Sequence, residues 1–207
     1  MGLKKKIKKN DTIFFITTNY FEKKFNFQKT IKKVLKKNKI NTKKYFFKFI
    51  DKTPNGPAYT VNSIKYDLKN SKTPCTVINP DQYIDFHLPK KILFNNLYFP
   101  LHFNNHGNSS YVKLNKSKYI IEIMEKNLIS TFASSGVYIF GSTILLKKIL
   151  NLIDKFNLNK EVNMSELINI FFKKYKRQGI PVSTYSKYDL GNVKSIQNFP
   201  IKKINID

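Results

Sequence analysis

A short apolar run, Cys75–Ile78, leads into two acidic residues, Asp81 and Asp85. An apolar segment of this length, bounded by polar and proline residues, is typical of a strand buried on both faces, as in a parallel sheet. Ligands of open α/β sheets bind at the carboxyl ends of such strands, and Asp81 lies just beyond this one. The run therefore favours a layered sheet and makes Asp81 a candidate metal ligand. The alternative is that Asn79, Pro80 and Asp81 only form a turn.

The chain before this run alternates between strand and helix patterns. Segments rich in β-branched and aromatic residues predict strands, and segments with apolar residues at helical spacing predict helices. In chain order they are a strand at Thr12–Thr17, a helix at Phe27–Lys37, a strand at Tyr45–Ile50 and a helix at Ala58–Leu68. Such alternation indicates parallel strands joined by crossover helices, which is an α/β layered domain.

After Phe86 the pattern changes to strands with little helix between them, which predicts a partly antiparallel extension of the sheet. The expected strands are Leu97–Phe103, Tyr111–Leu114, Tyr119–Met124, Val137–Phe140 and Ile180–Tyr185, and the expected helices are Ile144–Phe156, Ser165–Lys176 and Val193–Phe199. Asn163 or Ser165 is expected to cap the second helix. We therefore expect an α/β fold with a Rossmann-like mixed sheet and flanking helices. It forms a single domain over residues 11–200, between a basic, disordered arm (1–10) and a tail (201–207).

Lysine dominates the charge of the chain. Of 38 basic residues only Arg177 is an arginine, and the formal net charge is +25. Such an excess is compatible with nucleic-acid binding, because basic residues neutralise phosphates. Proteins that read base edges and phosphates rely, however, on the bidentate guanidinium fork of arginine. The lysines also accompany many Asn, Ile, Phe and Tyr residues, all of which have A/T-rich codons. A solvated, lysine-rich surface is therefore favoured over a nucleic-acid site.

The sequence contains no signal for a membrane or for export. No apolar run approaches the roughly 20 residues of a membrane span. The basic start is followed by Asp11 and a short apolar run, Ile13–Thr17, which does not form the core of a signal peptide. We therefore expect a cytoplasmic protein. Cys75 is the only cysteine, so no internal disulfide is expected, and its place in the apolar run indicates packing.

Several short motifs follow one another along the chain: Asn55–Val61, Asn79–Tyr83, Tyr111–Leu114, Glu122–Lys126, Ala133–Phe140 and Asp189–Asn192. In order and spacing they resemble motifs of the sugar-nucleotide pyrophosphorylases. The first resembles the Gly-x-Ala helix start of that family, the second its acidic strand end, and the last its closing Asp-Ile-Gly-Thr. The resemblance covers residues 11–199 and implies a nucleotide-diphospho-sugar transferase fold. It also implies a reaction in which a sugar 1-phosphate and a nucleoside triphosphate give a nucleotide sugar and pyrophosphate, as in nucleotide-sugar or surface-polysaccharide biosynthesis.

The resemblance implies catalytic roles for Asp81 and Asp189, which would hold Mg²⁺, and for Lys126, which would bind the sugar phosphate. In nucleotidyl transfer the sugar phosphate attacks the α-phosphorus of the triphosphate, so charge must be neutralised and the groups held in line. Two carboxylates from distant parts of the chain suit an octahedral Mg²⁺ that also takes phosphate oxygens and waters. Without the resemblance, Asp189 is better interpreted as a turn former.

The resemblance also implies substrate contacts. Glu125 would bind sugar hydroxyls, Gly136 would let the sugar approach the backbone closely, and Gly56 would offer amides at a helix N-terminus to the nucleotide. Taken alone, these residues have simpler interpretations. Glu125 and Lys126 can form a solvated charge pair, and Gly136 can mark a bulge.

One part of the family pattern is missing from this sequence. The pyrophosphorylases begin with a strand and a G-x-G-x-R loop that binds the triphosphate. Here no glycine occurs between Gly2 and Gly56, and the sole arginine is Arg177. The stretch from Phe86 to Leu97 is also short for the helix that usually follows the acidic motif. We therefore expect an N-terminally shortened fold without the central strand partner and without the triphosphate loop.

Three functions remain compatible with the sequence. The first is a nucleotidyltransferase whose front part is missing from the chain or supplied by another one. The second is a non-catalytic relative that binds a sugar phosphate or nucleotide sugar, or acts as a partner subunit. An open strand edge tends to find a partner, so a homo- or hetero-oligomer is expected in both cases. The third is a basic nucleic-acid-binding protein.

Overall fold

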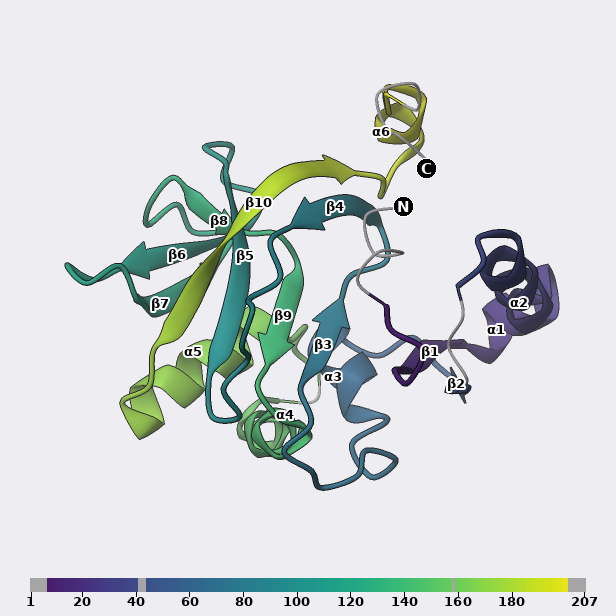
Figure 1. Cartoon of the computed structure of the whole chain (residues 1–207), viewed down its shortest axis with the longest axis horizontal. Helices are drawn as coiled ribbons and strands as arrows, with labels where there is room; N and C mark the ends of the chain where they lie inside the picture. Colours follow the sequence, from purple (N-terminus) through teal and green to yellow (C-terminus); the bar gives the residue numbers. More distant parts are fainter. Residues whose placement is uncertain (1–6, 41–43, 158, 201–207) are drawn as a thin grey trace.

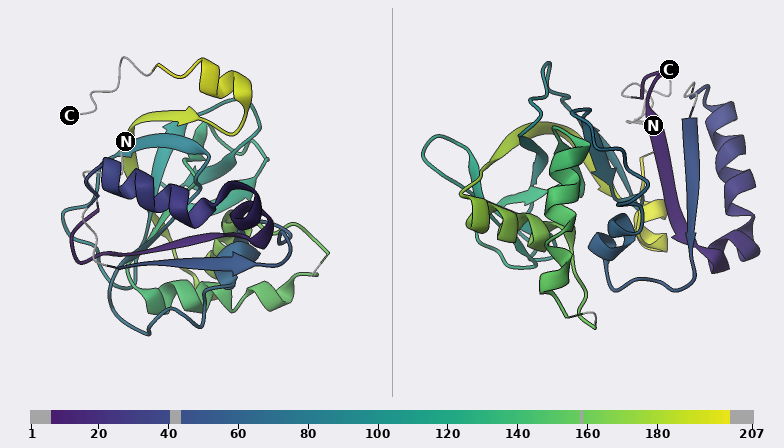
Figure 2. Two further views of the ribbon diagram at one scale, coloured as in Figure 1. Left: turned by 90° about the vertical axis from the view of Figure 1, so that its right-hand side faces the viewer. Right: turned by 90° about the horizontal axis from the view of Figure 1, so that it is seen from below.

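The strands form two separate sheets in the computed structural model, which describes residues 7–40, 44–157 and 159–200. Most of the predicted basic arm and the whole tail 201–207 lie outside the described residues. The smaller sheet consists of β1 (Thr12–Thr18) and β2 (Lys44–Ile50), which run parallel with Thr12 opposite Lys44. Between them come α1 (Asn19–Phe25) and α2 (Phe27–Lys37). These helices cover the face of the small sheet that points away from the rest of the molecule (Figure 2).

Side chains point alternately to the two faces of the small sheet and pack against α2 on one face and the main core on the other. On one face the Phe15 and Phe47 rings stack at 5.3 Å, and Phe27 of α2 meets Phe47 edge-on. On the other face Phe14 and Ile16 pack against the main core. The predicted strand, helix and strand of this region are confirmed, whereas α1 was not predicted.

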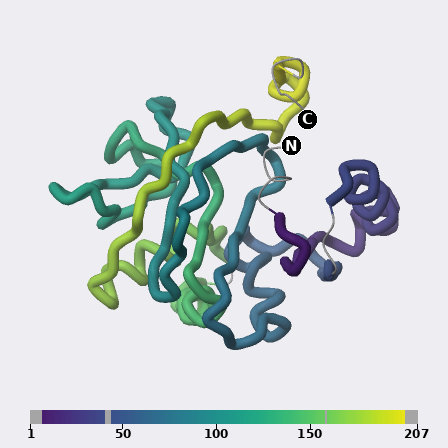
Figure 3. The backbone as a smooth tube through the Cα atoms, in the orientation of Figure 1, coloured from purple at the N-terminus to yellow at the C-terminus, as the bar shows by residue number. Residues whose placement is uncertain are grey.

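The larger sheet has eight strands in the order β3-β9-β5-β8-β6-β7-β10-β4, with an additional β5–β10 pairing (Figure 1). Its strands are β3 (Cys75–Ile78), β4 (Gln82–Phe86), β5 (Leu97–Phe103), β6 (Ser110–Leu114), β7 (Ile120–Glu125), β8 (Phe132–Ser134), β9 (Val137–Phe140) and β10 (Gly179–Asp189). Most of its pairings are antiparallel, and β10 pairs with β5 in parallel. The long β10 crosses the molecule and reaches both β5 and β4 (Figure 3). The predicted mixed sheet is confirmed.

The expectation that Cys75–Ile78 forms one parallel sheet with the first two strands is wrong, because β3 belongs to the larger sheet and β1 and β2 form the smaller one. This strand, β3, pairs antiparallel with β9, with Cys75 opposite Phe140. The partner lies some sixty residues further along the chain, and a local pattern carries no information about such a distant pairing. Within the described residues β1 pairs only with β2, and β3 only with β9. Within these ranges, β1 and β3 therefore each have one edge without a strand partner.

The remaining helices are short. They are α3 (Pro57–Asn62), α4 (Thr143–Leu150), a 3₁₀ turn at Ile153–Lys155, α5 (Met164–Tyr175) and α6 (Val193–Gln197). The helix predicted at Ala58–Leu68 is thus shorter, and the one at Ile144–Phe156 divides into α4 and the 3₁₀ turn. No helix follows β4 before β5 begins at Leu97, as the short intervening stretch predicted. Among the described residues, no helix has the length and apolarity that a membrane crossing requires.

Both faces of the large sheet are covered. Phe99 and Phe140 face a core formed with α3, α4 and α5, where Phe99 meets Phe172 edge-on at 6.0 Å. The neighbouring residues Tyr98 and Ile139 point to the opposite face and join a smaller cluster with Phe86. Burial on both sides explains why the central strands read as continuous apolar runs. This packing also fixes the positions of the strand ends, which carry polar residues.

Candidate functional site

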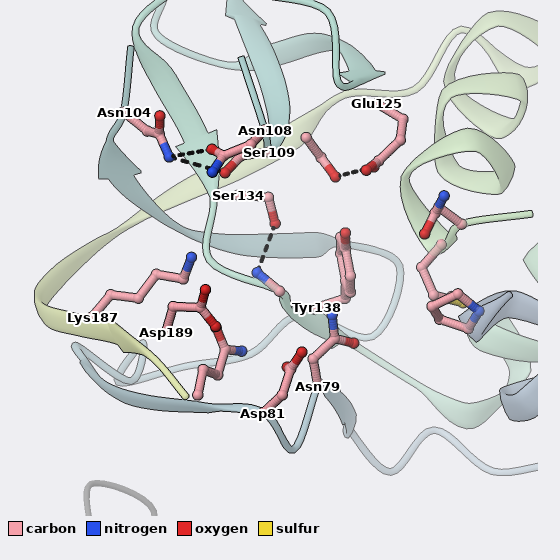
Figure 4. Close-up of a pocket in the computed structure, with 16 residues that line it drawn as sticks. Asn79, Asp81, Asn104, Asn108, Ser109, Glu125, Ser134, Tyr138, Lys187 and Asp189 are labelled. Atoms are coloured by element: carbon pink, nitrogen blue, oxygen red, sulfur yellow. Dashed lines mark hydrogen bonds between the residues drawn. The ribbon is translucent and has the colours of Figure 1, made fainter. Parts of the chain in front are cut away.

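A polar cavity of about 300 Å³ lies where β3 and β10 end. Its walls come from the turn between β3 and β4, the end of β10, the hairpin of β6 and β7, and the first residues of α3 and α5 (Figure 4). Four of the residues that the sequence singled out line it: Asp81, Glu125, Gly136 and Asp189. Segments more than a hundred residues apart in the chain therefore meet in one site.

Two carboxylates, Asp81 and Asp189, converge at the floor of the cavity. The antiparallel pairing of β10 with β4 places Asp189 opposite Gln82, and the Leu190 amide donates to the Asp81 carbonyl at 2.7 Å. A Cβ built on Gly191 would lie 3.2 Å from Asp189 Oδ1 and 3.4 Å from Asp81 Oδ2, so both side chains border the same point. The turn interpretation of Asp189 also holds, since its Oδ1 accepts the Gly191 amide at 2.9 Å.

Glu125 occupies the opposite wall and is held by two serines. Its carboxylate accepts from Ser110 at 2.5 Å and from Ser165, in the first turn of α5, at 2.8 Å. Beside it, burial raises the pKa of the Tyr138 phenol, while hydrogen bonds to Ser134, Ser110 and Ser165 oppose this. Glu125 is thus a fixed, half-buried acceptor, and its interpretation as a solvated charge pair with Lys126 is wrong.

Gly136 lines the cavity between the Asp81–Asp189 pair and Glu125. Its φ of +72° lies in the left-handed region, and an added Cβ would lie 2.9 Å from Gln82 Nε2 and 3.2 Å from Asn79 Nδ2. The backbone N–H of Asn79 also donates to the Gly136 carbonyl at 3.1 Å. Glycine is therefore required for two side-chain amides to reach the cavity wall.

Solved structures with a similar fold include sugar nucleotidyltransferases. A nucleoside-diphosphate-sugar pyrophosphorylase of Vibrio cholerae matches with a TM-score of 0.71 at 17% sequence identity, over 91% of this chain and 80% of that protein. A UDP-glucose pyrophosphorylase complexed with UDP-glucose gives 0.66 at 14%, over 89% and 77%. An inositol-1-phosphate CTP transferase of T. maritima gives 0.61 at 11%, over 83% and 69%. The chain has the fold of the sugar-nucleotide pyrophosphorylases.

This likeness is one of fold. No protein-family model matches the sequence, and no curated protein matches it. The sugar-nucleotide pyrophosphorylase fold nevertheless confirms the resemblance inferred from the motifs, since it extends over 91% of this chain in the Vibrio cholerae structure.

Within the pyrophosphorylase fold, Lys126 and Lys187 lie in different surroundings. Lys126 follows β7 in a left-handed conformation with φ of 51°, is exposed, and does not line the cavity. Lys187 does line it, because it lies two residues before Asp189 on β10 and alternate residues of a strand share a face. Burial lowers the pKa of the Lys187 ammonium, and the nearby Asp189 and Asp81 carboxylates oppose this.

Gly56 does not line the cavity, and the backbone amides of Gly56 and Ala58 already donate to carbonyls within the fold. The Gly56 amide donates to the Pro54 carbonyl at 2.8 Å, and the Ala58 amide donates to the Val162 carbonyl at 3.0 Å. A Cβ on Gly56 would lie 2.5 Å from the Val162 oxygen. Gly56 therefore allows α3 to pack closely against the segment before α5, and the expected amide contact with a ligand is not available in this arrangement.

The donor set at the floor of the cavity fits Mg²⁺. Two carboxylates leave several positions of an octahedral ion for waters and phosphate oxygens, which is how this metal is usually bound beside phosphates. The described residues contain no group of three or more His, Cys, Asp or Glu side chains that would form a closed metal site. Asp81 and Asp189 are therefore suited to a metal that is shared with a ligand.

Residues that line the cavity but were not predicted from the sequence include Asn104, Ser110 and Lys187. Ser165 was predicted only as a possible helix cap, and its contact with Glu125 was not predicted. Asn104 Nδ2 donates to Ser109 and Asn108, and the Tyr111 hydroxyl donates to Asn104 Oδ1 at 3.0 Å, which orders the loop before β6. Isolated Asn and Ser residues in loops carry no signal. Lys187 did carry one, since its spacing of two from Asp189 places it on the same face of a strand.

Proposed function

We propose that the cavity binds a sugar 1-phosphate and a nucleoside triphosphate, or the nucleotide sugar formed from them, and that the protein is a sugar 1-phosphate nucleotidyltransferase of nucleotide-sugar biosynthesis. The observation that carries this proposal is the convergence of Asp81 and Asp189 on one point, opposite the hydrogen-bonded Glu125, in one polar cavity. The fold of solved pyrophosphorylases supports it. The cytoplasmic location expected from the sequence remains a prediction.

In the proposed reaction a phosphate oxygen of the sugar 1-phosphate attacks the α-phosphorus of the triphosphate. The new phosphorus–oxygen bond forms as the bond to the bridging oxygen breaks, and pyrophosphate leaves. Mg²⁺, bound by Asp81 and Asp189, would supply positive charge to the phosphate oxygens during this exchange. The two carboxylates are held ready by the β10–β4 pairing, so that little reorganisation is needed.

Glu125 has the chemistry of a sugar acceptor. Its two serine donors fix its orientation and leave acceptor capacity on the carboxylate for ligand hydroxyls. Tyr138 and Ser134 add hydroxyls to the same wall. A polyhydroxylated ligand fits such a wall better than an apolar one, because each buried polar group then finds a partner.

Release of pyrophosphate from glucose 1-phosphate and a panel of nucleoside triphosphates in Mg²⁺ tests the proposal. Asp81→Asn and Asp189→Asn should each abolish the release. Asp154→Asn removes the same charge from an exposed residue outside the cavity and should leave the release unchanged. Equal activity in all three variants would contradict the proposed site.

A second candidate is a non-catalytic binder of a sugar phosphate or nucleotide sugar. It is favoured by the sequence, which contains no G-x-G-x-R motif to hold the triphosphate. In that case the purified chain binds UDP-glucose with an affinity that depends on Asp81 and Asp189, but releases no pyrophosphate. Binding and turnover, measured on the same preparation, therefore separate the two candidates.

A further inference from the structure

We propose that Lys187, rather than Lys126, supplies the cationic contact for a phosphate group of the ligand in this cavity. This inference rests on the proposed function and assigns a phosphate-binding residue within the same site. It is argued from the position of the Lys187 side chain, from the charge of the cavity, and from a neighbouring donor without a partner.

The first argument is position. Lys187 lies on β10 opposite Ile84 and shares the face of the strand with Asp189. Its ammonium points toward the middle of the cavity, between the carboxylates on the floor and the Asn104 wall (Figure 4). Asp189 and Asp81 are close enough to influence it electrostatically, yet no ion pair within 4 Å joins Lys187 to either in the described part of the chain. Its three donors therefore remain for a ligand.

The second argument is charge. The residues that line the cavity include three carboxylates, Asp81, Glu125 and Asp189, and one cation, Lys187, which gives a formal net charge of −2. An anionic phosphate would be repelled from such a cavity unless cations face it. A metal at the Asp pair would neutralise part of this charge, and Lys187, beside the pair, is the one positively charged side chain among the described residues that line the cavity. Phosphate binding at this site is thus expected to depend on Lys187.

The third argument is a nearby unused donor. Gln82 Nε2 is buried, lies against Gly136, and has no hydrogen-bond partner among the described residues. Gln82 lies directly opposite Asp189 in the β10–β4 pairing, so it occupies the same face as Lys187. A buried donor without a partner destabilises the protein until a ligand or water satisfies it. A phosphate oxygen that reached the Gln82 side-chain amide would give this donor a partner on the same face of the sheet as the Lys187 ammonium.

The position of Lys126 argues against the role that its sequence motif implied. Its amide donates to the Ser109 carbonyl at 2.9 Å, which fixes a tight left-handed turn after β7. That turn leaves the side chain exposed, outside the cavity wall. The proposed phosphate-binding charge therefore lies near the end of β10, on Lys187, and not after β7, on Lys126.

Isothermal titration with glucose 1-phosphate, UDP-glucose and inorganic pyrophosphate, each with Mg²⁺, tests the inference. Lys187→Met should weaken binding by about tenfold or more, the effect of losing a charge-assisted hydrogen bond. Lys187→Arg should restore most of the affinity, which a purely structural role would not require. Lys126→Met and the exposed Lys116→Met remove the same charge elsewhere and should change affinity less than twofold. Thermal melts of each variant show whether it is folded.

The outcomes separate this inference from the proposed function. If folded Lys187→Met binds all three ligands as the natural chain does, or if Lys126→Met is the weakened variant, the inference is overturned and the proposed function stands. If the natural chain binds pyrophosphate through Lys187 but neither sugar ligand, the assignment of Lys187 stands and the proposed function falls. If the natural chain binds none of the three ligands, both are overturned.

Discussion

Single residues of this chain differ sharply in how far their chemistry follows from their neighbours in sequence. Cys75 was assigned to packing from its place in an apolar run, and the structure places it against the main core with its thiol facing the Ser142 carbonyl. Lys126 was assigned to phosphate by its motif, yet a positive φ turns it out of the site. The difference is physical: packing follows from strand character, whereas side-chain direction after a strand depends on the turn.

The Cys75 thiol is expected to be inert in the folded protein. Burial raises its pKa to about 12, so hardly any reactive thiolate exists near neutral pH. We expect no measurable reaction with iodoacetamide at pH 8 over an hour and complete reaction in 8 M urea, followed by intact mass. Rapid alkylation of the native protein would contradict the packing role.

His102 is expected to make the fold sensitive to acid. Burial and the nearby Lys187 lower the pKa of its imidazole from 6.5 to about 4, against a hydrogen bond with Ala133. The folded state thus holds the neutral ring, and the stabilisation is present above pH 6.5 and is lost as pH falls through about 4. His102→Gln should flatten the decline of melting temperature between pH 6.5 and 4, whereas His106→Gln, at an exposed site, should not. Identical declines in both variants would contradict this assignment.

At the scale of elements, the start of α5 matters because it carries Ser165 into the site. Glu166 accepts the Asn163 amide at 2.9 Å and pairs with Lys160 at 2.9 Å. Glu166→Ala loses both contacts and should lower the free energy of unfolding by about 1 kcal/mol. Glu166→Gln keeps an acceptor for the amide and loses only an exposed ion pair, so it should cost a few tenths of a kcal/mol. Urea unfolding measures both, and equal losses would assign the stability to the ion pair.

Most elements could be predicted from sequence, but their partners could not. The limits of β1, α2, β2 and β3 agree with the predictions to within one residue, because apolar periodicity is local. β4 was missed because its five residues, Gln82–Phe86, do not alternate regularly between polar and apolar and directly follow a strong turn signal. β8 has three residues, too few to show the alternation of apolar and polar residues that predicts a strand. Which strand lies beside β3 depends on packing around Phe140, a contact that no short window contains.

The residues of the site divide in the same way: some could be predicted from the sequence, and others became recognisable only in the folded chain. Asp81, Glu125, Gly136 and Asp189 were predicted together because the motif order of a known fold places them together, and the structure brings all four into one cavity. Gly56 was expected there too, but its amides are used within the fold. Ser110 and Ser165, which orient Glu125, come from different elements and became recognisable only when β6, β7 and α5 had packed together.

For the whole molecule, the contrast between an overall charge of +25 and a cavity whose lining carries −2 matters most. Lysines spread over the surface create a field that attracts any polyanion, and this attraction is screened by salt. In the proposed function, the cavity selects among anions through directed contacts, among them those with a metal at the Asp pair and with Lys187. Non-specific attraction and specific binding should therefore respond to different changes in the protein.

This separation gives a prediction about nucleic acid. We expect duplex DNA to bind through surface lysines, with an affinity that falls about 1,000-fold between 50 and 200 mM salt where six or more phosphates are neutralised. Asp81→Asn and Asp189→Asn should leave that binding within twofold, while both variants lose Mg²⁺-dependent binding of UDP-glucose. Fluorescence anisotropy with a labelled duplex and titration calorimetry with UDP-glucose measure the two on the same samples. DNA binding that persists at 200 mM salt, in a chain that binds no sugar ligand, would favour a nucleic-acid function over the cavity.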